Sequence, residues 1–259
     1  MIGYKIAKNM EGNRVVVTLE IPGDALTNMA RSSVVVRNTA KHRANKAKVV
    51  AIEDASGTPY TTATSFSYDK KSLIYKVGET IEEPSYNPNP ELVCAEGIHY
   101  FLTRRVAELY GLEKIENGLF QQWRDNGQKY LEETCVDGKR HGLYQYWGED
   151  GQKLTEATFI DGKLHGLFQS WYDNGQKNAV ATYVDGKRHG LLQEWYKNGQ
   201  KTGEVTYVDG SPHGLYQYWG EDGTLLDEAV YEHGFKKFPN HLSSADPHTC
   251  GPAPPDPYS

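Results

Sequence analysis

Six basic residues without an acidic neighbour form the first group in this sequence that could do chemistry. The chain has no Asp or Glu between Asp24 and Glu53, and that stretch holds six Lys and Arg residues. Such a segment can bind phosphate, a nucleotide or nucleic acid. Alternatively it is a solvated strand edge, where lysine also prevents edge-to-edge aggregation. The residues of the candidate anion site are Arg37, Lys41, Arg43 and Lys46.

A cysteine and a histidine form the second group. Cys94 and His99 are five positions apart around Gly97, and a Cys–His pair can supply a nucleophile. No third group completes this pair, so we expect His99 to be a sheltered structural histidine. The sequence also has no Gly-rich phosphate loop, zinc-binding pair or serine-nucleophile elbow. We therefore predict a chain that is not an enzyme, with no catalytic residue, metal ligand or cofactor.

The strongest pattern in the sequence is a unit of 24 residues that occurs five times in its second half. Each copy has a Gly-Leu step followed by a tryptophan, and two Asn-Gly, Asp-Gly or similar turn signals recur in each unit. These turns accept the positive φ of tight hairpins. The repeat glycines and tryptophans, which we expect to be structural, are Gly118, Gly142, Gly166, Gly190, Gly214, Trp123, Trp147, Trp171, Trp195 and Trp219.

Two turns per unit leave two short segments, which predicts one β-hairpin per repeat. Histidines one repeat apart would then be about 9–10 Å apart, too far to share a zinc ion with ligand nitrogens about 2 Å from the metal. Alternation along the strand places each tryptophan on the same face as a leucine, and we expect that face to be the core. The aromatic residues of the other face are the candidate interaction surface, since tyrosine is enriched at interfaces. They are Tyr144, Tyr146, Phe168, Tyr216 and Tyr218.

The pattern Asp-Gly-Lys-x-His-Gly-Leu-aromatic-x-x-Trp-x-x-(Asn/Asp)-Gly resembles MORN repeats over about residues 113–236. The variant that it resembles is the one found in bacterial proteins often labelled antitoxin-like, the YwqK type. This resemblance implies an elongated single-layer sheet of successive hairpins that acts as an interaction or membrane-associated scaffold. The first copy has Asn117 in place of His, and the last departs at His233, so both ends read as caps.

Residues 1–112 lack the repeat. Strands are predicted at Val15–Ile21, Ser33–Val36, Lys48–Ile52 and Ser72–Val77, and a helix at Thr103–Tyr110. The segments Arg43-Ala-Asn-Lys-Ala-Lys-Val-Val-Ala-Ile, Tyr75-Lys-Val-Gly and Cys94-Ala-Glu-Gly-Ile-His-Tyr-Phe-Leu-Thr resemble an uncharacterised domain of phage, bacterial and giant-virus proteins. That resemblance implies no activity, but it favours a phage or viral origin.

The predicted fold is mainly β: a small β-rich α+β domain (1–112), five hairpin repeats in one antiparallel layer (113–238) and a Pro-rich, flexible tail (239–259). Composition agrees, with 18 Tyr, 5 Trp and 26 Gly but only 38% apolar residues. The first 112 residues hold 14 Lys and Arg against 12 Asp and Glu, and the rest hold 14 against 22, so the net charge of −6 divides into +2 and −8. Three separated cysteines and no apolar leader indicate the cytoplasm, or a host cytoplasm if the protein is viral.

Three functions remain open at this stage. The first is a non-catalytic module that binds a protein partner through the repeats, as an antitoxin-like or host-factor-blocking accessory protein. The second is a small anionic ligand or nucleotide binder, or an enzyme, that uses the basic N-terminal domain. The third is peripheral membrane association, which the −8 of the repeat half opposes. The same acidic balance disfavours nucleic acid as a partner.

Overall fold

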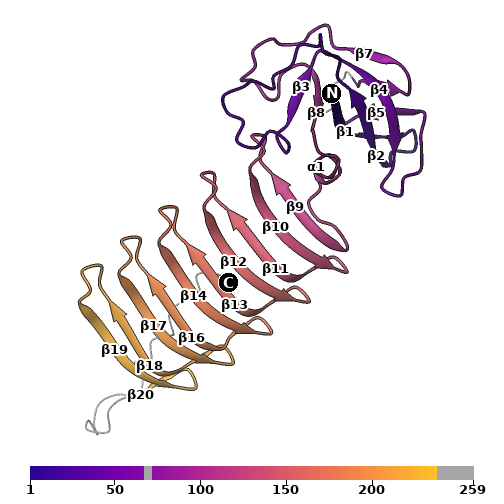
Figure 1. Cartoon of the computed structure of the whole chain (residues 1–259). Coiled ribbons are helices and arrows are strands. Elements are labelled where there is room, and N and C mark those ends of the chain that lie inside the picture. Colours follow the sequence, from indigo (N-terminus) through magenta and orange to yellow (C-terminus); the bar gives the residue numbers. More distant parts are fainter. Residues whose placement is uncertain (67–71, 238–259) are drawn as a thin grey trace. The chain divides into compact units, whose positions relative to one another are not determined.

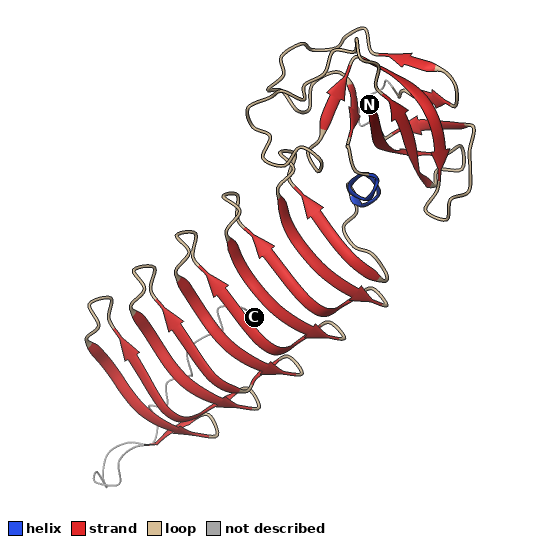
Figure 2. Ribbon diagram, in the orientation of Figure 1, coloured by secondary structure: helices blue, strands red, loops and turns tan. Residues whose placement is uncertain are grey.

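The computed structural model describes residues 1–66 and 72–237 (Figure 1). The chain divides into two compact units, one of residues 1–114 with 121–130 and the other of residues 115–120 with the chain from 131 onward. The described residues are mostly strands, as predicted, with one short helix, α1 (Arg104–Leu109) (Figure 2). No helix among them is long and apolar enough to cross a bilayer. The predicted flexible tail, 239–259, lies outside the described residues.

The N-terminal unit contains a six-stranded antiparallel sheet in the order β6-β5-β1-β2-β4-β7. Its strands are β1 (Ile2–Lys8), β2 (Arg14–Glu20), β4 (Lys46–Glu53), β5 (Thr62–Ser65), β6 (Ile74–Lys76) and β7 (Thr80–Glu82). A separate pair is formed by β3 (His42–Ala44) and β8 (Ile98–Tyr100). Three of the four predicted strands and the predicted helix are therefore confirmed, within one or two residues at their ends.

Alternating apolar residues build the core of this unit. In β2, Val15, Val17 and Leu19 are fully or almost fully buried, because their spacing of two places all three on one face of the sheet. Residues of β4, β5, β6 and β8 complete the same cluster. One residue on this buried side is not apolar: Lys5 of β1 lies opposite Val17 in the β1–β2 register.

The fourth predicted strand, Ser33–Val36, was wrong. That segment is a series of turns, and its backbone is bound to the first turn of the repeats instead of to a strand. The amides of Val35 and Val36 donate to the carbonyl of Asn126 at 3.0 and 3.1 Å, and the amide of Lys41 donates to that of Asp125 at 3.1 Å. Gly127 is required here, because a Cβ on it would lie 2.0 Å from the Val36 carbonyl oxygen.

The repeats form one antiparallel sheet in which hairpins follow one another along the chain (Figures 1 and 2). Its strands are β9 (Gly118–Trp123), β10 (Lys129–Val136), β11 (Lys139–Trp147), β12 (Lys153–Ile160), β13 (Lys163–Trp171), β14 (Lys177–Val184), β15 (Lys187–Arg188), β16 (Gly190–Trp195), β17 (Lys201–Val208), β18 (Ser211–Trp219), β19 (Leu225–Glu232) and β20 (Phe235–Lys237). The predicted single layer of repeated hairpins is therefore confirmed.

Left-handed backbone recurs at equivalent places in the repeats, two of which are informative here. The first residue of the Asp-Gly turn is left-handed, with φ of 50° at Asp137, Asp161 and Asp185. Asp tolerates this conformation better than most residues. The glycine of the Gly-Leu step is left-handed as well, for example Gly166 with φ of 90°. It lies where the register between β12 and β13 shifts, so the glycine allows a bulge in every hairpin.

Side chains also connect successive repeats. The Tyr172 hydroxyl donates to the carbonyl oxygen of Trp195 at 2.8 Å, and Tyr196 donates to that of Trp219 at 3.0 Å, one repeat further on. Asn174 Nδ2 similarly donates to the carbonyl of Lys197 at 2.7 Å. The repeats that contain Tyr172 and Tyr196 are therefore joined to the repeats that follow them through equivalent bonds, as expected of a solenoid whose units depend on stacking.

Candidate functional sites

The two faces of the repeat sheet differ in burial. One face, here called the tyrosine face, has aromatic or large residues on the first strand of each hairpin opposite small ones on the second. Tyr144 lies opposite Ala157, and Phe168 lies opposite Ala181. Phe168, Ala157 and Ala181 are at most 6% exposed and belong to one apolar cluster. The tyrosine face is therefore the covered side of the sheet.

Burial differs among the residues of the predicted interaction surface. Phe168 is 6% exposed, and Tyr144 and Tyr216 pack as half-buried members against the same cluster. Tyr146 and Tyr218 are half-buried too. The ring of Tyr144 is further covered by the Arg140 guanidinium, 4.7 Å from its centroid. Large rings next to alanine fill the space over a thin sheet, so this row stabilises the fold.

The exposed apolar row lies on the opposite side, here called the leucine face. It carries one leucine from each repeat, and all five are between 44% and 50% exposed. They are Leu119, Leu143, Leu167, Leu191 and Leu215. The prediction that the face shared by leucine and tryptophan is the core was therefore wrong, although the two residue types do share a face.

The repeat tryptophans are half-buried, and lysines of neighbouring strands cover part of the rings. Lys177 Nζ lies 5.8 Å from the centre of the Trp195 ring, and Lys201 Nζ lies 5.6 Å from that of Trp219. Trp123 differs, because it packs with Phe101 and Val106 in the N-terminal unit. The rings of Trp195 and Trp219 are thus partly screened by cations.

Polar side chains lie between the leucines and the tryptophans. Each set of a glutamine, a glutamate and a lysine that bridges two neighbouring strands is here called a polar rung. Gln145 donates to Glu156 at 2.8 Å, and Lys153 lies 2.5 Å from the same carboxylate. Gln193, Glu204 and Lys201 repeat this arrangement. The lysine bond, and then the glutamine bond, lower the pKa of both glutamates. Both carboxylates therefore stay charged at neutral pH.

The repeated histidines lie beside the Asp-Gly turns. The Nδ1 atoms of His141, His165 and His189 are 3.5–3.6 Å from the aspartates 20 residues later. No group of three or more metal-ligating side chains occurs within residues 1–66 and 72–237. The histidine row therefore contributes to the turns between repeats.

The four residues of the predicted anion site do not come together. Arg43 is fully buried, and its guanidinium donates to the carbonyl oxygens of Asn87, Glu96 and Asn89 at 2.7–3.0 Å. Lys46 pairs with Asp24 at 2.5 Å. Arg43 thus fixes the loop before β8, and Lys46 is neutralised at the surface.

The other two residues of that predicted site, Arg37 and Lys41, differ in their surroundings. Arg37 is exposed, and its carbonyl oxygen lies 2.8 Å from Nε2 of the buried His42. Lys41 lines a cavity of about 430 Å³ in the N-terminal unit. Of the four predicted residues, Lys41 is the one placed where a small ligand could reach it within the described part of the chain.

Two cations that were not predicted from the sequence also line the cavity. Lys5 of β1 and Arg14 of β2 line it together with Lys41, and His99 completes the polar lining. A signal for Lys5 existed, because a lysine at position 5 interrupts the apolar row of Gly3 and Ala7 on the buried side. Arg14 has no such signal, since arginine at the start of a strand is ordinary.

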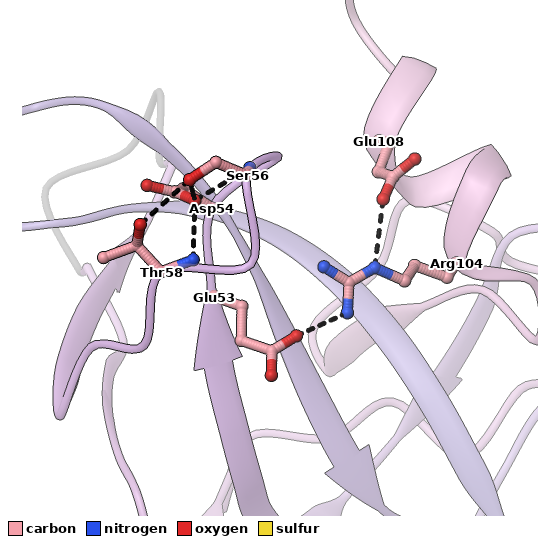
Figure 3. Close-up of polar contacts among 6 residues, drawn as sticks. All are labelled: Glu53, Asp54, Ser56, Thr58, Arg104 and Glu108. Atoms are coloured by element: carbon pink, nitrogen blue, oxygen red, sulfur yellow. Dashed lines mark hydrogen bonds and ion pairs between the residues drawn. The ribbon is translucent and has the colours of Figure 1, made fainter.

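Helix α1 positions one wall of the cavity. Arg104 in its first turn pairs with Glu53 at the end of β4 at 2.7 Å, and with Glu108 at 3.0 Å (Figure 3). The Asp54 carboxylate orders the adjoining turn through Ser56 and Thr58. At the C-terminal end of α1, the carbonyl oxygens of Glu108 and Tyr110 accept hydrogen bonds from Arg14 at 3.2 and 2.7 Å.

The Cys94–His99 pair has no nucleophilic geometry. His99 Nε2 lies 3.0 Å from the carbonyl oxygen of Val93. Burial, and then the charges of Lys41 and Lys5, lower the pKa of His99 to about 3, so the ring is neutral. The Cys94 thiol has Lys41 Nζ at 3.5 Å and an Asp125 carboxylate oxygen at 3.7 Å as neighbours. The histidine is thus engaged with backbone.

Comparison with known families matches each half of the chain separately. A family described as "MORN repeat variant" matches residues 164–185 and 188–209, which cover nearly all of β13–β14 and β15–β17. A "Family of unknown function (DUF5758)" matches residues 1–107. No curated protein matches the chain significantly. Two segments of the repeat sheet are thus similar in sequence to MORN repeats, and both form hairpin strands in the structure.

Proposed function

We propose that the repeat sheet is a non-catalytic interaction module that binds a protein partner through its leucine face. The observation that carries this proposal is the row of five leucines, one per repeat, each close to half exposed. Isolated exposed leucines are ordinary, but a regular row of them on one face supports an interaction surface. Equivalent leucines are two strands apart, or about 9–10 Å, so the surface suits a partner with apolar groups at similar intervals.

The rungs beside the row give the surface a polar rim. Glu156 and Glu204 stay charged, and the half of the chain from residue 113 has a net charge of −8. A partner with basic residues around an apolar centre fits this arrangement best, because charge complementarity speeds association and rejects wrong partners. An antitoxin-like or host-factor-blocking protein would use the surface in this way.

The test is capture of partners from cell lysate with three forms of the full chain. One is the wild type, one carries Leu167→Lys and Leu191→Lys, and the control carries Leu26→Lys and Val50→Lys at exposed positions of the N-terminal unit. We expect the wild type and the control to retain the same specific protein, and the leucine-face variant to lose it. Equal retention by all three forms would rule out the leucine face as the binding surface.

A further inference from the structure

The cavity of the N-terminal unit occupies a gap in strand pairing along β1. On the side of β1 away from β2, Tyr4 pairs with Phe101, and Ala7 and Lys8 pair with β5. Lys5 and Ile6 lie between these pairings and line the cavity. The cavity volume of about 430 Å³ is in the range of small-molecule sites.

Three cations line this gap. Lys5 lies on the same side of β1 as the buried Gly3 and Ala7, and it is half-buried itself. Within residues 1–66 and 72–237 its ammonium group has no hydrogen bond or ion pair. Burial, and then the nearby charge of Lys41, lower the pKa of Lys5 to about 8. At neutral pH the unit therefore holds a sheltered, mostly protonated amine beside a second cation.

The other two cations are held in place by neutral groups. Lys41 Nζ donates to the Tyr110 hydroxyl at 3.0 Å and to the Cys94 sulfur at 3.5 Å. Asp125 lies close enough to favour the charged form of Lys41, but it does not line the cavity. Arg14 is bound to the two carbonyls at the end of α1. Lys41 and Arg14 are therefore fixed before any ligand arrives, which reduces the ordering cost of binding.

The rest of the lining is aromatic. Phe66 and Phe101 line the cavity from the two segments that separate along β1, and Tyr110 follows α1. The Arg14 guanidinium is 5.6 Å from the Phe66 ring centre, and the rings of Phe101 and Tyr110 are 4.9 Å apart. A planar apolar group could contact these rings, while an anionic group meets the lysines.

We propose that this cavity binds a small phosphorylated ligand with a planar ring system, the class to which aryl phosphates and nucleoside monophosphates belong. Lys5 and Lys41 bind the phosphate, and Phe66, Phe101 and Tyr110 contact the planar group. A phosphate dianion matches two neighbouring ammonium groups better than a carboxylate, which has a single charge. The neutral His99 ring takes part in shaping the cavity and not in neutralising the ligand.

The experiment is isothermal titration calorimetry on the full chain. The probes are phenyl phosphate as the smallest member of the class, the four nucleoside monophosphates, inorganic phosphate and adenosine. We expect at least one of the phosphorylated planar probes to bind, and inorganic phosphate and adenosine to bind at least tenfold more weakly. Absence of binding by every phosphorylated planar probe would overturn the proposal, as would equal binding of inorganic phosphate.

Three variants locate the binding. Lys5→Met and Lys41→Met each remove an ammonium group but keep most of the side-chain volume, and each should weaken the bound probe at least tenfold. Lys46→Met is the matched control, because Lys46 pairs with Asp24 outside the cavity, and its affinity should equal that of the wild type. Circular dichroism checks that each variant is folded. Unchanged affinity in a folded Lys5→Met variant would overturn the assignment of this site.

Discussion

At the scale of the residue, the first prediction concerns Lys5 of the cavity. Its positive charge opposes folding, because burial disfavours the charged form. The pKa of Lys5 falls to about 8 in the folded chain from 10.5, so the unfolded chain binds more protons between these pH values. The contribution of Lys5 to the free energy of unfolding therefore increases as the pH is raised from about 8 to about 10.5. We expect Lys5→Met to have a higher Tm than the wild type at pH 7. The difference should shrink as the pH rises through that window.

Thermal unfolding of both forms at a series of pH values measures this prediction. Comparing the two forms cancels the titration of the tyrosines, which both share. A Lys5→Met variant that is less stable than the wild type at pH 7 would show that the ammonium group has a stabilising partner, contrary to the environment described here.

Arg43 has the opposite role. Its buried guanidinium binds three backbone carbonyls, and the carbonyls would lose these donors in Arg43→Met. We expect a loss of about 3 kcal/mol in the free energy of unfolding, measured by urea denaturation. The exposed Arg37→Met is the control, with an expected change within about 0.5 kcal/mol. A loss at Arg43 no larger than that of the control would contradict its structural role.

At the scale of the element, the bulge glycines fix the shape of each hairpin. Gly166 has φ of 90°, and a Cβ there would meet Thr158 only at 3.9 Å. The cost of Gly166→Ala is therefore backbone strain without a clash, about 1–2 kcal/mol. Gly203 in β17 has no such φ, and its Cβ would be in ordinary contact at 3.7 Å. We expect Gly203→Ala to be neutral or to stabilise by about 0.5 kcal/mol.

Urea denaturation of the two alanine variants side by side measures this difference. Both glycines belong to the same sheet, so the comparison separates backbone conformation from the general effect of a methyl group. Equal effects in the two variants would mean that the left-handed glycine is not needed for the bulge.

The elements also show how far the sequence predicts this protein. The hairpins follow from the turn glycines at fixed spacing, and the strands of the N-terminal core follow from alternation in segments such as Val15–Leu19. Alternation separates the two faces of a strand but does not say which face is covered. The informative signal was the pairing of Tyr144 with Ala157, since a large ring beside a small residue indicates packing.

Two features could not be predicted from local sequence patterns. The segment Ser33–Val36 has strand-like residues, but its amides bind the turn at Asn126, about 90 residues later. The cavity depends on Lys5, Lys41 and Tyr110, which come from separate parts of the chain and meet only in the folded unit. Contacts of this kind depend on tertiary structure, and no spacing in the sequence encodes them.

At the scale of the whole molecule, the charge distribution predicts weak binding to anionic membranes. The chain has a net charge of −6, and the residues from 113 onward have −8. Anionic lipid should repel this half. We expect the protein to stay with the soluble fraction in flotation with phosphatidylcholine–phosphatidylserine vesicles at 0.15 M salt. Flotation with these vesicles that is lost in the Leu167→Lys and Leu191→Lys variant would favour a membrane role for the leucine face.

The central claim is that the leucine face, and not the tyrosine face, meets the partner. Photo-crosslinking in cells tests it most directly, with benzoylphenylalanine at position 167 or 191 on the leucine face and at position 146 or 218 on the tyrosine face. The account predicts a crosslinked partner from positions 167 and 191 and none from 146 and 218. Crosslinking from 146 and 218 alone, or from no position, would contradict it.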